Sequence, residues 1–243
     1  MKKLAYRSIF LLLLSTLLLL TLLLTAILGQ ASAPTPPGQQ PIILVHGYMD
    51  SGDAMVMPIL KENLVKIGYR ASDIYIISFG DPLTTIDSPD VYAAVLLPYV
   101  KQISEAYGKK VDLVCHSMGG LVARWCVEKL AGDQYVDDMV TLATPHQGTL
   151  MSFVMYWTPA CQAMAPGSDF LKALNDGTLA QGVEYTAVYT LLDEIVTPNS
   201  YAMIPSPEIK SVAKARNIEV GFVEHITCAT LTSVLDKWKV YLN

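Results

Sequence analysis

The sequence has little of what metal sites and nucleic-acid binding need. It contains 4 cysteines and 4 histidines in 243 residues, with no C-x-x-C pair and no cluster of histidines. This composition argues against zinc, and no acidic run is specific enough to predict calcium, so we expect no metal and no cofactor. Lys and Arg are also scarce, at 17 against 22 Asp and Glu, which gives a net charge of −5. The negative charge argues against nucleic acid as a partner.

A long apolar run occurs only at the N-terminus. Residues 9–28 form a nearly unbroken apolar run of 20 residues, preceded by three basic residues and followed by Ala31-Ser32-Ala33. These are the features of a secretory leader over residues 1–33, cleaved after Ala33. The run is also long enough to cross a bilayer, so an uncleaved anchor that holds the protein on the outer face of the membrane is the alternative to secretion. Removing the leader changes the net charge from −5 to −8 and leaves 210 residues, enough for one domain.

The rest of the chain alternates between strand-like and helix-like patterns. A proline-rich linker, residues 34–41, precedes this region. Strands are expected at residues 42–45, 74–79, 111–115, 139–143, 185–189 and 218–222, and helices at 55–67, 91–106, 118–130 and 230–241. Apolar strands that alternate with helices predict a mostly parallel sheet of about six strands with helices on both faces. We therefore expect one α/β domain over residues 42–243, with its working residues at the carboxyl ends of the strands.

The segment Cys115-His116-Ser117-Met118-Gly119-Gly120 directly follows one of these strands. It is similar to the pattern G-x-S-x-G, in which a serine nucleophile sits on a sharp turn between a strand and a helix. Cys115 replaces the first glycine and is small enough for that crowded position. The alternative is that Ser117 only caps the helix that follows it, so other residues must decide.

A serine nucleophile needs a histidine to accept its proton and an acid to orient that histidine. In α/β-hydrolases the order along the chain is serine, acid, histidine, which removes His46 and His116 and leaves His146 and His225. His225 follows the last strand and comes after candidate acids, so it is favoured over His146.

Asp193 and Glu194 are the candidate acids, because they end the run that begins with the strand at 185–189. Consecutive residues at a strand end point in opposite directions, so the pattern alone leaves the choice open. The oxyanion of the reaction needs two backbone N–H groups. We expect these from Met118, which follows the nucleophile, and from Tyr48, in the loop after the first strand.

With Val45-His46-Gly47-Tyr48, the Ser117 segment, Asp193-Glu194-Ile195-Val196 and Glu224-His225 in this order, the chain resembles the small secreted bacterial triacylglycerol lipases and esterases of the α/β-hydrolase fold. The resemblance covers residues 41–243. It implies a serine carboxylic-ester hydrolase that cleaves acylglycerols or related acyl esters through an acyl-enzyme. It also implies Asp193 as the acid and His225 as the base. Two alternatives stay open: an acyltransferase with the same triad, and a hydrolase-like binding protein or chaperone of the cell envelope.

An apolar insertion over residues 149–182 adds a cluster that contains Met151, Phe153, Tyr156 and Trp157. These side chains could form an acyl-binding wall, a partial lid that meets a lipid–water interface, or simply buried packing. We expect them to bind substrate, with a lipid or acyl ester as the partner. The pattern names no protein partner.

The four cysteines allow three disulfide pairings in an exported chain. Cys115 ends a strand and Cys126 lies on the following helix, where small buried thiols are common. We therefore predict that Cys161 and Cys228 form the disulfide.

Overall fold

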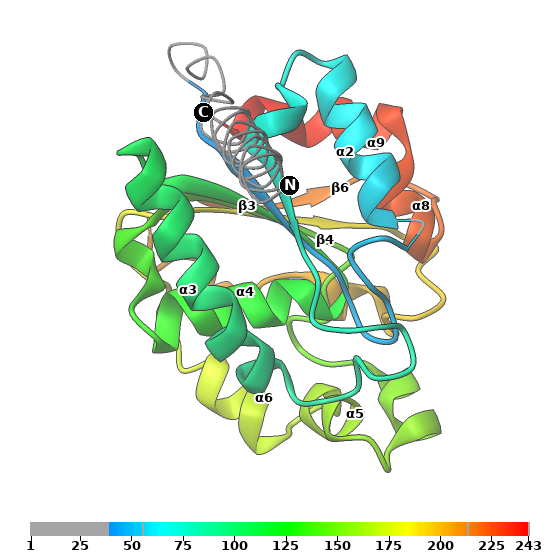
Figure 1. Ribbon diagram of the computed structural model, residues 1–243. Helices are drawn as coiled ribbons and strands as arrows, with labels where there is room; N and C mark the ends of the chain where they lie inside the picture. Colours follow the sequence, from blue (N-terminus) through cyan, green and yellow to red (C-terminus); the bar gives the residue numbers. More distant parts are fainter. Residues whose placement is uncertain (1–38, 55, 213, 243) are drawn as a thin grey trace, which may run out of the picture. The chain divides into compact units, whose positions relative to one another are not determined.

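The computed structural model describes residues 39–242 with the exception of Met55 and Ala213 (Figure 1). The predicted leader, residues 1–33, and most of the predicted linker lie outside this range, so both stay predictions. Within the described range, no helix has the length and apolar character needed to cross a membrane.

A six-stranded sheet forms the centre of the domain. Its strands are β1 (Ile42–Val45), β2 (Ile74–Ile77), β3 (Val111–His116), β4 (Val136–Leu142), β5 (Glu184–Tyr189) and β6 (Ala215–Glu219). They pair in the order β2-β1-β3-β4-β5-β6, and every pair is parallel. The structure confirms the predicted parallel α/β sheet, whose strands all point their carboxyl ends to one edge.

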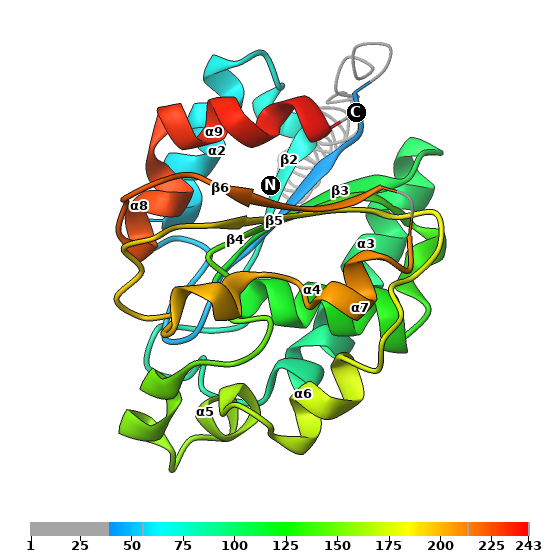
Figure 2. The ribbon, with the colours of Figure 1, turned by 180° about the vertical axis from the view of Figure 1, so that it is seen from behind.

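Helices cover both faces of the sheet (Figures 1 and 2). One face packs against α3 (Pro89–Tyr107), α4 (Met118–Lys129), α5 (Pro159–Met164) and α6 (Asp169–Leu174), and the other against α2 (Val56–Lys66), α8 (His225–Thr230) and α9 (Thr232–Trp238). Alternation along a strand supplies both cores: in β1, Ile43 and Val45 belong to the first and Ile42 and Leu44 to the second. Strands buried on both faces explain the continuous apolar runs in the sequence.

Shorter helices complete the domain. They are α7 (Ser206–Ile209) and the 3-10 turns η1 (Ala71–Asp73), η2 (Gly132–Gln134), η3 (Leu150–Met155), η4 (Asn199–Ala202) and η5 (Lys239–Tyr241). η3 and α5 both lie in the predicted insertion, which is therefore ordered into short helical turns.

Two elements near the C-terminus differ from the prediction. β6 covers residues 215–219 instead of 218–222, because Arg216 bonds to Thr186 and Glu184 on β5 and so holds the polar start of the strand in the sheet. The helix predicted over residues 230–241 begins two residues later, as α9 from Thr232, and η5 follows it to Tyr241. A separate helix that the sequence did not predict, α8, precedes it and ends at Thr230, and His225 is the first residue of this helix.

The predicted Cys161–Cys228 disulfide is wrong. Both thiols are buried and free, as are those of Cys115 and Cys126. The physical reason is the sheet itself: Cys161, on α5, belongs to the core on one face of the sheet, and Cys228, on α8, belongs to the core on the opposite face. A disulfide requires Cα atoms within about 7 Å, which a sheet between the two side chains prevents.

Candidate active site

The candidate nucleophile sits on a sharp turn between β3 and α4. The backbone of Ser117 has φ 55° and ψ −131°, a conformation that non-glycine residues rarely adopt. Its N–H donates to the carbonyl of Leu142, and its carbonyl accepts from the hydroxyl of Thr144 at 2.8 Å. Bonds from the end of β4 therefore hold the strained turn in place. The side chain of Ser117 makes no capping bond to α4, which argues against the alternative that Ser117 is only a helix cap.

Glycines allow the turn to pack this closely. A Cβ on Gly119 would lie 2.4 Å from the carbonyl oxygen of Val45, and a Cβ on Gly120 would lie 2.1 Å from the hydroxyl oxygen of Thr144. On the other side of the nucleophile, a Cβ on Gly47 would lie 2.8 Å from the Cβ of Ser117. The glycines after Ser117 were expected from the sequence. Glycine is also required at position 47, but only because the folded chain brings the loop after β1 against the turn that carries Ser117.

His225 and Asp193 meet at the same edge of the sheet. Nδ1 of the His225 ring lies 2.9 and 3.0 Å from the two carboxylate oxygens of Asp193. The carboxylate is itself held by the N–H groups of Ile195 and Val196, at 2.9 and 2.8 Å. Because Nδ1 faces Asp193, Nε2 is the ring nitrogen left for proton transfer. Both residues are buried, at 5% and 4% exposure.

Glu194, the competing acid, points elsewhere. Its Oε2 accepts the backbone N–H of His225 at 3.0 Å and does not meet the ring nitrogen that Asp193 holds. The structure thus separates two neighbouring carboxylates that the sequence pattern could not distinguish.

Two of the other histidines, His146 and His46, have structural contacts of their own. His146 is fully buried and bonds through Nε2 to the Thr141 hydroxyl at 2.9 Å; burial, with a smaller contribution from Arg124, lowers its pKa well below the usual range. His46 accepts the N–H of Phe79 and bonds to the carbonyl of Gly47, so it joins two loops at the carboxyl edge.

One cavity of about 370 Å³ joins the candidate residues. Ser117 and His225 both line it, together with Gly47, Tyr48 and Asp50 from the loop after β1. The rest of the lining is largely apolar and includes Ala54, Val56, Pro145, Met164, Ile195, Val196 and Ile226. Within the described residues no hydrogen bond joins Ser117 to the His225 ring, and catalytic contacts of this kind often tighten only around a substrate.

The loop that carries Tyr48 is tied to the insertion. The Tyr48 hydroxyl lies 3.3 Å from the hydroxyl of Thr158 and donates to the sulfur of Met155 at 3.6 Å. Met118, the other expected donor, is the first residue of α4, where backbone N–H groups have no acceptor within the helix. Met118 directly follows Ser117, and Tyr48 lines the same cavity and follows Gly47, which packs against Ser117.

The four insertion residues expected to bind substrate lie outside the cavity lining. Met151, Phe153, Tyr156 and Trp157 are exposed, Trp157 by 72%, and the Phe153 and Tyr156 rings stack with centroids 5.6 Å apart. The insertion instead contributes Met164 to the cavity. With Leu150 and Val154, which are also exposed, these four form an apolar surface that we call the apolar rim.

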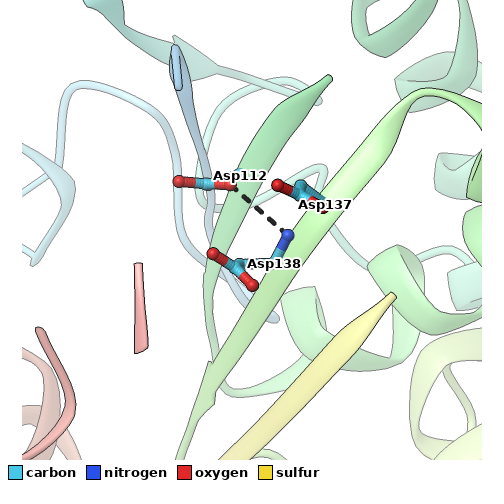
Figure 3. Close-up of side chains that lie close together, drawn as sticks. All are labelled: Asp112, Asp137 and Asp138. Atoms are coloured by element: carbon cyan, nitrogen blue, oxygen red, sulfur yellow. Dashed lines mark hydrogen bonds between the residues drawn. The ribbon is translucent and has the colours of Figure 1, made fainter. Parts of the chain in front are cut away.

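A second polar cluster lies at the opposite, amino end of the strands. Asp112 of β3 faces both Asp137 and Asp138 of β4, because the pairing register shifts there and sets two residues against one (Figure 3). Oxygens of the three carboxylates lie within 4.8 Å of one another. Burial raises the pKa of the Asp112 carboxyl well above its usual range, and the charges of Asp138 and Asp137 raise it further. Sequence reasoning missed this cluster because its members are far apart in the chain.

Comparisons with known proteins point to one family. The family model for Lipase (class 2) matches residues 39–232. Over 111 residues the chain is 32% identical to a triacylglycerol lipase of Pseudarthrobacter phenanthrenivorans and to one of Burkholderia plantarii. These matches cover 45% of this chain and 34% and 30% of the two relatives. The chain thus matches about a third of the length of these curated relatives.

Solved structures share the fold. The mature form of the Bacillus licheniformis lipase BlEst2 superposes with a TM-score of 0.70 at 19% identity, covering 87% of this chain and 95% of that one. The Pyrococcus furiosus esterase Pf2001 superposes with a TM-score of 0.58 at 16% identity, covering 84% of this chain and 80% of that one.

Proposed function

Because the chain belongs to the class 2 lipase family, we propose that it hydrolyses carboxylic esters, with acylglycerols or related acyl esters as substrates. One observation carries the proposal: Ser117, on a strained turn, shares a cavity with His225, whose other ring nitrogen is bonded to Asp193. Serine, histidine and aspartate in this arrangement are the elements of acyl transfer.

In the proposed reaction, Oγ of Ser117 attacks the ester carbonyl carbon while Nε2 of His225 accepts the hydroxyl proton. Asp193 stabilises the resulting imidazolium through Nδ1. The N–H groups of Tyr48 and Met118 hold the oxyanion. The imidazolium then protonates the departing alkoxide, which leaves as the alcohol and generates the acyl-enzyme.

A water molecule completes the cycle. His225 removes a proton from the water, the hydroxide attacks the acyl carbonyl, and the proton returns to Ser117 as the carboxylic acid leaves. The chemistry needs no group beyond these residues and water.

The cavity favours an acyl chain over a polar substrate. Its walls are mostly aliphatic, and its volume is within the range of small-molecule sites, about 300–1,000 Å³. The apolar rim lies on the same insertion that supplies Met164 to the cavity wall, so we propose that this surface contacts the lipid–water interface.

The test is hydrolysis of p-nitrophenyl butyrate and tributyrin by the wild type and by Ser117→Ala. We expect the variant to lose at least ~1,000-fold in kcat, since the nucleophile of a triad contributes on that scale or more. A serine-directed fluorophosphonate should label Ser117 in the wild type. Equal hydrolysis by the variant, or no labelling of Ser117, would contradict the proposal, and the second result would favour a binding protein.

A further inference from the structure

The main chain of His225 depends on a partner from outside its own helix. His225 is the first residue of α8, and the first N–H groups of a helix have no acceptor within it. Glu224, at the preceding position, makes no capping bond with its side chain. Oε2 of Glu194 accepts the His225 N–H instead, at 3.0 Å. A carboxylate at this end also suits the positive end of the helix.

The carbonyl of His225 has a second partner outside the helix. Nε2 of His116 lies 3.3 Å from the carbonyl oxygen, and the two imidazole rings pack with centroids 4.8 Å apart. A carbonyl can only accept, so Nε2 of His116 carries the proton and donates it. Burial lowers the pKa of His116 to about 3, with a further contribution from His225, so the ring stays neutral at ordinary pH.

Both partners are neighbours of other proposed triad residues. Glu194 directly follows Asp193, and His116 directly precedes Ser117. The loop that carries the acid and the turn that carries the nucleophile are therefore each bonded to one side of the same residue. These two bonds fix the position of the His225 backbone. The bond from Asp193 holds only the ring, and it would still allow the backbone to shift.

We propose that Glu194 and His116 are positioning residues that hold the main chain of His225 so that its Nε2 faces Ser117. The inference rests on the proposed function, in which His225 is the base. A misplacement of about 1 Å can cost ~100-fold in rate. Loss of one of two bonds permits a smaller shift, so we expect a loss of about tenfold in kcat. KM should stay nearly unchanged, because Glu194 is exposed and does not line the substrate cavity.

The experiment compares Glu194→Ala, Glu194→Gln and the control Glu224→Ala in the full chain. Glu224 is exposed, lies next to His225 and lines the same surface hollow as Glu194, so its removal deletes the same charge from the same place without breaking the bond. With p-nitrophenyl butyrate, Glu194→Ala should lose about tenfold in kcat, while Glu194→Gln, whose amide oxygen still accepts, and Glu224→Ala should stay within about twofold of the wild type.

Hydrogen exchange of the His225 backbone amide gives a readout that does not need turnover. The amide should be protected in the wild type, in Glu194→Gln and in Glu224→Ala, and should exchange at least ~10-fold faster in Glu194→Ala, which has lost the acceptor. His116→Phe keeps a ring of similar shape and removes the donor, so its kcat should also fall, whereas its KM can change as well because His116 lines the substrate cavity.

Two results would overturn the inference: unchanged protection of the His225 amide in Glu194→Ala, or a kcat of Glu194→Ala equal to that of Glu224→Ala. A wild type that hydrolyses no ester would refute the proposed function instead, and the exchange comparison would still decide whether Glu194 holds His225.

Discussion

The carboxylate cluster at the amino end of β3 and β4 makes a direct prediction about stability. Oδ1 of Asp112 accepts the N–H of Asp138 at 3.3 Å, and Oδ2 has no hydrogen-bond partner among the described residues. Asp112 is fully buried beside Asp137 and Asp138. We expect Asp112→Asn to stabilise the protein, because the amide oxygen can keep the Asp138 bond while the amide nitrogen can donate to a neighbouring carboxylate.

The magnitude follows from the burial. A buried polar group without a partner costs about 1–3 kcal/mol, so we expect a gain of about 2 kcal/mol in the free energy of unfolding at pH 8. For a domain of this size that corresponds to a rise of roughly 4–8 °C in Tm.

The gain should depend on pH in a defined direction. In the unfolded chain an aspartate has a pKa of about 3.9. In the folded protein, burial holds the pKa of Asp112 well above that value, with Asp138 and Asp137 adding to the effect. Between the two values the folded state keeps the proton that the unfolded state releases, so the wild type loses stability as pH rises. The variant lacks this loss, and its advantage should grow from pH 4 upward.

Thermal unfolding of the wild type and of Asp112→Asn at pH 4, 6 and 8 measures the effect, with the exposed Asp87→Asn as control. Ester hydrolysis should be unchanged, since the cluster lies at the opposite end of the strands from Ser117. An equal Tm difference at all three pH values would refute the reasoning, as would destabilisation at pH 8.

Two further predictions concern the insertion and the thiols. Replacing the exposed Phe153 and Trp157 with serine should lower the hydrolysis of emulsified tributyrin several-fold and leave the hydrolysis of soluble p-nitrophenyl butyrate unchanged. An equal loss on both substrates would contradict this prediction and indicate that the two side chains act on the bound substrate instead of at the interface. Dithiothreitol should shift the Tm by less than about 1 °C, since all four cysteines are free. A large fall in Tm would instead show that the protein contains a disulfide, such as Cys161–Cys228.

The sequence was sufficient for features that depend on nearby residues. The turn at Ser117 follows from an apolar strand, a serine and two glycines in succession, and the structure shows the strained backbone and the close approach that this pattern needs. The parallel sheet follows from apolar runs that alternate with helices. The start of β6 was misplaced because its polar residues are held by bonds to β5, which local periodicity does not reveal.

Other features depended on which residues the folded chain brings together. Asp193 and Glu194 are chemically alike and adjacent in the sequence. Only the folded position of His225 decides that Asp193 bonds to its ring and Glu194 to its backbone N–H. Cys161 and Cys228 are both buried thiols, and only the intervening sheet keeps them apart. Strand pairing alone gathers Asp112, Asp137 and Asp138. The physical reason is common to all three cases: periodicity and turn sterics act over a few neighbouring residues, whereas hydrogen bonds and charge interactions depend on distances that the packed fold sets.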